Sequence, residues 1–175
     1  MEHHVHRPFR QADGASRASE RRQNRTEDTE LQIIEVGQGD IRPSTLVHVP
    51  AIGTVIPGDV VYNRIHAMMG LSTPDQWQQW LVSIDAIEAL STSRIIAGHK
   101  QPNASDEDVR AMLDGTRAYT RDFAAAAPDA QDADQLVSLM LLKHPECANP
   151  WTLPVLRKRL VPAATRGRRL AARKD

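Results

Sequence analysis

Residues 55–63 read VIPGDVVYN, and this stretch decides the fold of the chain. An apolar run ends in Pro57 and Gly58, and a carboxylate, Asp59, follows at once. A buried strand that ends at a turn delivers the next polar side chain to the rim of its sheet. We therefore expect Asp59 to lie at the rim of a sheet.

A second stretch repeats this arrangement. Residues 94–100 read RIIAGHK, so a short β-branched strand ends in Gly98 and presents the imidazole of His99. One predicted helix separates the two stretches, and a strand–helix–strand crossover brings both strand ends to the same side of a sheet. The sequence thus predicts that Asp59 and His99 lie close together.

Taken in this order, the motifs Gly-Asp-Val-Val-Tyr-Asn at 58–63 and Ala-Gly-His-Lys at 97–100 resemble the C-terminal half of metallo-β-lactamase-fold hydrolases. The resemblance covers about residues 31–145. It implies an α/β fold, the C-terminal half of an αββα sandwich, with a mostly antiparallel sheet and helices on one face. It also implies that Asp59 bridges two metal ions and that His99 binds the second, with zinc or another divalent metal as the cofactor.

The same resemblance suggests a substrate pocket for a small molecule. Tyr62, Asn63 and His66 follow Asp59 closely and are its candidate residues. For His66, a plain loop position is an equal alternative.

The chain departs from the family at the other metal ligands. The family opens its site with His-x-His-x-Asp-His, of which His4-Val5-His6 matches only the first half. A later Gly-His turn is replaced by a turn that holds Gln38, and an amide is a poor zinc ligand beside imidazole or carboxylate. Two protein ligands do not normally make a zinc site, so we expect weak metal binding at Asp59 and His99.

The chain divides into three segments. Residues 1–30 are polar, with no apolar periodicity, and are predicted to be disordered; 31–147 form the metallo-β-lactamase-like half-domain; 148–175 form a terminal helix and a basic tail. Within the half-domain, strands are predicted at 31–36, 44–50, from 54, and at 94–97, and helices at 73–90, from 105 to 123, and at 132–144.

Several residues with functional side chains are interpreted as structural. Trp77 and Trp80 lie on the apolar face of the 73–90 helix and are predicted to be core. His48 alternates with valines inside a strand, and His144 is predicted to sit at a helix end near the dipole. Ser105 is the predicted N-cap of its helix.

Composition excludes several classes. Lys+Arg and Asp+Glu both total 22, and aromatic residues make up only 4%, so nucleic acid is not an expected partner. No apolar run approaches the roughly 20 residues of a membrane span. The single cysteine excludes an internal disulfide and fits a cytoplasmic protein.

Three functions stay open on the sequence alone. The chain is a truncated metal-dependent hydrolase with an incomplete site, an inactive remnant that serves as a binding or interaction module, or an enzyme that uses Asp59 and His99 as an acid/base pair. A half-sandwich also leaves one sheet face uncovered, so we expect self-association through an apolar patch of Leu46, Val55, Val61 or their neighbours.

Overall fold

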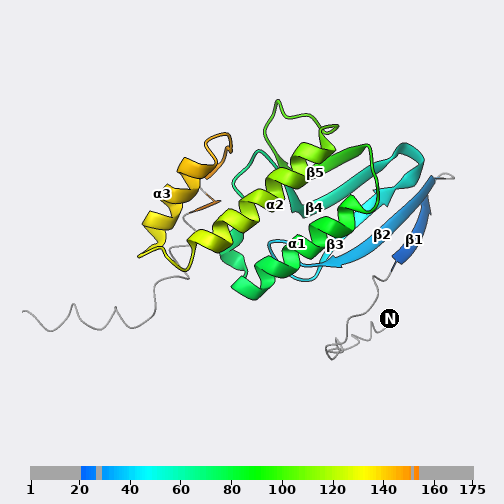
Figure 1. The fold of residues 1–175 in the computed structure, drawn as a ribbon. Coiled ribbons are helices and arrows are strands. Elements are labelled where there is room, and N and C mark those ends of the chain that lie inside the picture. The colour runs from blue at the N-terminus through cyan, green and yellow to red at the C-terminus, as the bar shows by residue number, and fades with distance from the viewer. Residues whose placement is uncertain (1–20, 27–28, 151, 154–175) are drawn as a thin grey trace, which may run out of the picture.

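A single sheet whose strands follow the order of the chain organises the molecule (Figure 1). A computed structural model describes residues 21–26, 29–150 and 152–153. Strands β1 to β4 pair antiparallel, and β4 pairs with β5 in parallel across the crossover helix α1. The elements are β1 (Arg21–Thr26), β2 (Thr29–Gly37), β3 (Ser44–Val49), β4 (Thr54–Asn63), α1 (Pro74–Glu88), β5 (Arg94–Lys100), α2 (Val109–Ala126) and α3 (Ala133–Lys143).

The predicted fold class is confirmed. The sheet is mixed and mostly antiparallel, and α1 and α2 pack side by side on one of its faces, while α3 packs against α2 (Figure 1). Trp80 and Phe123 sit fully buried between the helices and the sheet, as the predicted core requires. The indole Nε1 of Trp80 donates to the carbonyl of Val60 at 2.8 Å and so ties α1 to β4.

The helix starts follow local capping chemistry. Thr73 caps α1 in a capping box with Gln76, and Asp132 caps α3 by accepting from the amide of Gln135 at 2.8 Å. The predicted cap of α2 was wrong, because this helix begins only at Val109. Ser105 instead accepts from the amide of Glu107 and closes a turn before that helix.

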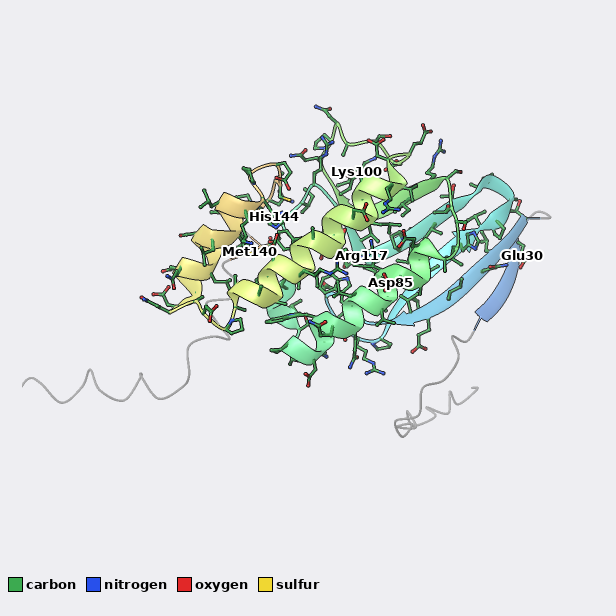
Figure 2. All side chains as sticks on the ribbon, viewed as in Figure 1. Glu30, Asp85, Lys100, Arg117, Met140 and His144 are labelled. Atoms are coloured by element: carbon green, nitrogen blue, oxygen red, sulfur yellow. The ribbon has the colours of Figure 1, made fainter. Side chains whose placement is uncertain are left out.

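One arginine joins the two covering helices. Figure 2 shows Arg117 of α2 directed toward Asp85 of α1. Its guanidinium lies 2.9 Å from Asp85, 2.7 Å from Glu88 and 3.0 Å from Asp114, and the side chain is only 11% exposed. These pairs fix α1 against α2 above the sheet.

The predicted disorder of residues 1–30 was wrong for residues 21–26 and 29–30. These residues form β1 and the start of β2, in continuous antiparallel register from Arg21↔Ile34 to Thr26↔Thr29. An edge strand is held by backbone hydrogen bonds and needs no apolar face, so hydrophobic periodicity does not reveal it. Residues 1–20, with His4 and His6, lie outside the described residues, as do most of the predicted terminal helix and the basic tail.

The three residues named for the uncovered sheet face are buried, and a neighbour of one of them is exposed instead. Leu46, Val55 and Val61 are at most 1% exposed. Ile56, next to Val55, and Ile96, next to the buried Ile95, are each 40% exposed. Alternation explains these two pairs, since adjacent strand residues point to opposite faces of a sheet. Self-association through this face stays a prediction.

None of the helices in the described part of the chain combines the length and apolarity needed to cross a bilayer.

Candidate metal centre

The parallel pairing of β4 with β5 brings Asp59 and His99 together. Asp59 Oδ1 lies 3.3 Å from His99 Nε2, and the two side chains are 44% and 45% exposed. The predicted juxtaposition of these residues is therefore present. Asp59 does not follow the end of its strand, however, since β4 continues to Asn63.

Two glycines make this approach feasible. Gly58 has a φ of +55°, a left-handed conformation that interrupts the β4–β5 ladder, whose register shifts on both sides of it. At Gly98, a Cβ atom would lie 2.8 Å from Asp59 Oδ1 and 3.0 Å from the backbone of Gly58. The Pro57-Gly58 and Gly98 signals in the sequence thus mark a bulge and a close approach, and not strand ends.

The ring of Tyr62 stacks on the imidazole of His99 and holds it in place. The two ring centroids lie 5.4 Å apart with planes 15° from parallel, and Tyr62 itself is only 5% exposed. Its amide donates to the hydroxyl of Thr116 on α2 at 3.1 Å. The core therefore orients His99 through a buried aromatic ring.

Sequence reasoning missed a second carboxylate, Asp40. It is 7% exposed, and burial together with the charge of Asp59 raises its pKa, while His99 lowers it. Its Oδ1 accepts from the amide of Ile41 at 2.7 Å. The neighbouring Gly39 is the sequence feature that points to this position. It brings the turn after β2 so close to β4 that a Cβ atom at Gly39 would lie 3.3 Å from the carbonyl oxygen of Asp59.

Gln38, at the position where the resembled family has a histidine, is buried at 1% exposure. Its Nε2 donates to the carbonyl of Gly39 at 2.8 Å, and its amide N–H donates to Ser83 of α1. The backbone N–H of Gln38 thus ties the turn to α1, while its side chain bonds within the turn.

The predicted pocket residues separate. Tyr62 and Asn63 line a cavity of about 330 Å³ between the end of β4, α2 and the segment after α3. Asn63 also donates to the carbonyl of Ser105 at 2.9 Å. His66 is 1% exposed and is not among the residues that line the cavity; its Nδ1 lies 3.2 Å from the hydroxyl of Tyr119. Burial lowers the pKa of His66, and the neighbouring His144 lowers it further.

The other histidines with a predicted structural role have protein partners. His48 Nδ1 lies 3.2 Å from Gln32 Oε1 across the β2–β3 pair. His144 ends α3, as expected, and its contacts with Asp122 and Glu146 were not foreseen.

Asp59 and His99 fit two ligand positions of a divalent metal. Ligand atoms about 2.1 Å from a tetrahedral zinc ion lie about 3.4 Å apart, close to the observed separation. Within the described residues, no third His, Cys, Asp or Glu joins them in a group whose ligand atoms all lie within 4.8 Å of one another. The centre is therefore incomplete in this part of the chain.

Comparison with known proteins identifies the fold. No family model and no curated protein matches the chain. A metallo-beta-lactamase family protein from Thermus thermophilus, TTHA1429, superposes with a TM-score of 0.54 at 16% identity, over 77% of this chain and 46% of that protein. A double mutant of the sec-alkylsulfatase PisA1 superposes with a TM-score of 0.50 at 14% identity, over 79% of this chain and 25% of that protein. A metallo-beta-lactamase from Pontibacter korlensis superposes with a TM-score of 0.46 at 13% identity, over 58% of this chain and 46% of that protein.

The superpositions on TTHA1429 and on the sulfatase variant establish a shared fold. The chain spans less than half the length of the solved structures it matches.

Proposed function

We propose that this chain, which has the metallo-β-lactamase fold over its described residues, is a metal-dependent hydrolase-like protein with an incomplete metal site, in which Asp59 and His99 supply two ligands to zinc or another divalent ion. The observation that carries the proposal is the 3.3 Å separation of Asp59 Oδ1 and His99 Nε2 on two strands joined by a crossover. The superposed proteins include a metallo-beta-lactamase family protein and a sulfatase, which supports the proposal.

The ligand residues are held in position by their surroundings. Tyr62 fixes the plane of the imidazole, and the missing side chain of Gly98 admits the carboxylate of Asp59. The charge of Asp59 contributes to the raised pKa of Asp40, and a cation bound beside Asp59 would offset this repulsion. A fully ligated divalent ion supplies hydrolysis with a water molecule of lowered pKa.

With two protein ligands, we expect a weak site. Most coordination positions then fall to water, so the ion is loosely held and its water is not fixed against a substrate. We therefore expect this chain to hydrolyse ester or lactam substrates no faster than a metal-free control. A small-molecule substrate would be contacted from the cavity side by Tyr62 and Asn63.

Calorimetric zinc titration tests the proposal. Every variant carries Cys147→Ser, so that the only thiol of the chain contributes no heat. We expect weak binding that disappears in both Asp59→Ala and His99→Ala and persists in Asp129→Asn, an exposed carboxylate on another part of the surface. Binding that is unchanged in Asp59→Ala and His99→Ala would contradict the assignment of these ligands.

Tight stoichiometric binding, lost in both variants and accompanied by turnover, would show a complete site. In that case the remaining ligands come from outside the described residues. A His4→Ala/His6→Ala double variant tests whether these two histidines are among them, and we expect it to bind zinc as the parent does, because His4-Val5-His6 matches only the first half of the family's opening motif.

A further inference from the structure

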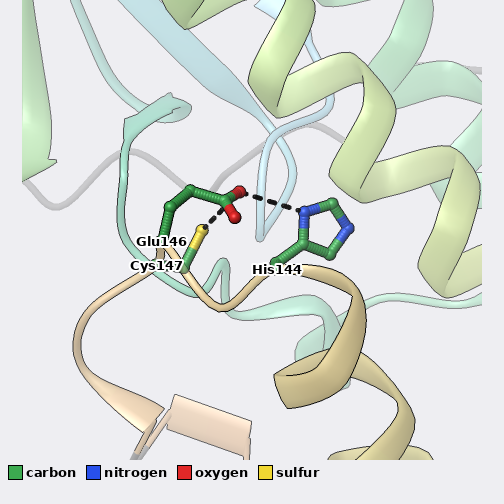
Figure 3. Close-up of side chains that lie close together, drawn as sticks. All are labelled: His144, Glu146 and Cys147. Carbon is green, nitrogen blue, oxygen red and sulfur yellow. Dashed lines mark hydrogen bonds and ion pairs between the residues drawn. The ribbon is translucent and has the colours of Figure 1, made fainter.

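A second cluster of metal-ligating side chains lies after α3, on the wall of the cavity (Figure 3). It consists of His144, Glu146 and Cys147, whose ligand atoms all lie within 4.8 Å of one another. Glu146 Oε1 is central to the group, 3.4 Å from His144 Nδ1 and 3.8 Å from Cys147 Sγ. None of these residues belongs to the Asp59–His99 centre.

We propose that His144 Nδ1, Glu146 Oε1 and Cys147 Sγ bind one zinc ion. Imidazole, carboxylate and thiolate are the donors that zinc takes in proteins. With bonds of about 2.1 Å to nitrogen and oxygen and about 2.3 Å to sulfur, neighbouring donors of a tetrahedral ion lie about 3.4–3.6 Å apart. The observed separations from Glu146 Oε1 are within a few tenths of an ångström of these values.

The second ring nitrogen of His144 has a partner of the kind that metal-binding histidines have. His144 Nε2 lies 3.1 Å from Asp122 Oδ2, and Lys143 Nζ lies 2.7 Å from Asp122 Oδ1. Asp122 is thus the hydrogen-bond partner of Nε2, and the hydrogen bond from Lys143 is the main cause that lowers the pKa of Asp122. Metal-binding histidines typically donate their second ring nitrogen to such a carboxylate.

The other ring nitrogen faces the second carboxylate. His144 Nδ1 lies 3.4 Å from Glu146 Oε1, while Nε2 lies 3.1 Å from Asp122 Oδ2. With the ring proton on Nε2, a zinc ion between Nδ1 and Glu146 would use the nitrogen lone pair and leave the contact with Asp122 in place.

Three protein ligands leave the fourth position of the ion open. The same three side chains line the cavity of about 330 Å³, which Met112 and Tyr119 also border. A zinc ion with three protein ligands and an open fourth position is the arrangement of catalytic sites, while structural sites are closed by four. The fourth ligand is therefore water or a small molecule held in this cavity.

The thiol must lose its proton before it binds a metal. Burial raises the pKa of Cys147 to about 12, with the charge of Glu146 adding to the effect, so the metal-free thiol keeps its proton. Zinc must displace that proton and then pairs directly with the thiolate. Because Cys147 is the only cysteine in the chain, a spectroscopic signal from metal–thiolate bonding reports this site alone.

Titration of the reduced full-length chain with Co²⁺, a spectroscopic substitute for zinc, tests the proposal. We expect a near-ultraviolet thiolate-to-metal charge-transfer band that saturates at one equivalent and disappears when Zn²⁺ is added. The band should be absent in Cys147→Ser and retained in Asp59→Ala and His99→Ala. Retention in the last two variants separates this site from the Asp59–His99 centre, so either proposal can fail without the other.

The positioning role of Asp122 has its own readout. Asp122→Asn should keep the charge-transfer band and weaken the affinity about 10- to 100-fold. Asp129→Asn controls for loss of a negative charge, and circular dichroism controls for folding. The proposal is overturned if the folded chain shows no band, or if the band keeps its affinity in both His144→Ala and Glu146→Gln, since the thiol alone would then account for it.

Discussion

The ring of Tyr62 stacks on the imidazole of His99, with centroids 5.4 Å apart, and its centroid lies 6.2 Å from that of Trp80, with the two planes tilted by 54°. One buried aromatic side chain thus connects the core of the protein to its candidate metal ligand. The same residue also borders the cavity that holds the second cluster.

Removing the Tyr62 ring should affect both stability and the metal centre. Tyr62→Ala should lower the free energy of unfolding by about 3–5 kcal/mol, in the range for large aromatic residues in a core. Tyr62→Phe keeps the stacked ring and should retain most of that stability. Urea denaturation measures both. Equal losses of stability in Tyr62→Ala and Tyr62→Phe would show that the hydroxyl, and not the ring, provides the stabilisation.

Gly98 provides the sharpest test of the Asp59–His99 geometry. In Gly98→Ala, the new methyl carbon would lie 2.8 Å from Asp59 Oδ1 and 3.0 Å from the Gly58 backbone, so the carboxylate must move away. We expect zinc binding at this pair to be lost in calorimetry while the circular dichroism spectrum is kept.

Gly115→Ala is the matched control for this substitution. Gly115 lies within α2, and a methyl group added there would have no neighbouring atom within 4 Å, so alanine should raise the free energy of unfolding by about 0.5–1 kcal/mol and leave binding unchanged. A Gly98→Ala variant that binds zinc as well as the parent would show that Asp59 does not need its observed position.

Arg117 should be the cation whose removal destabilises the helix layer most. Its side chain is 11% exposed and pairs with carboxylates of both α1 and α2 that are 42–65% exposed, so Arg117→Ala removes the packing of the arginine stem together with three ion pairs. We expect a loss of about 2–4 kcal/mol in chemical denaturation, somewhat below the value for fully buried pairs.

Arg110→Ala is the comparison for Arg117. Its side chain is 80% exposed and pairs with Asp114 and Glu88, so we expect at most about 1 kcal/mol. Similar losses in the two variants would contradict the role of Arg117 as the clamp between the helices.

His66 gives stability a dependence on pH. Tyr119 on α2 contacts it, and His144 and Glu146 are the charged or titratable groups that act on it from the segment after α3. Its pKa is lowered, mainly by burial, so the unfolded chain takes up its proton first as the pH falls. Stability should therefore be complete above the unfolded pKa of about 6.5 and should decrease as the pH falls below it.

Denaturation midpoints between pH 8 and pH 5, with a chelator present, measure this effect. His66→Gln should flatten the dependence, while His48→Gln, in a strand pair on the sheet, should leave it. A slope that is the same in the parent and in His66→Gln would assign the dependence to other groups.

Sequence patterns predicted most strands, the helices and the juxtaposition of Asp59 with His99, because each of these depends on hydrophobic periodicity or on a glycine at a special backbone position. They could not show β1, because residues 21–26 are polar and pair with β2 through the backbone. They also missed Asp40, which depends on how the turn after β2 packs near Asp59. The His144 cluster is local in the sequence, but residue types alone do not show that its three side chains turn toward one point.

The strand order has a consequence for how the molecule comes to be made. Because β1 to β5 are neighbours in the same order in space as in the chain, each strand's partner is already present when that strand leaves the ribosome. The sheet can therefore assemble progressively during synthesis, with short loops to close at the hairpins and one longer closure across α1. The last contacts to form are those that wait for the far end of the described chain, the bridge of Ile65 to Ala148 and the hydrogen bond from Thr152 to the carbonyl of His66. The cavity wall with His144, Glu146 and Cys147 is thus completed last, after the sheet that supports Asp59 and His99 already exists.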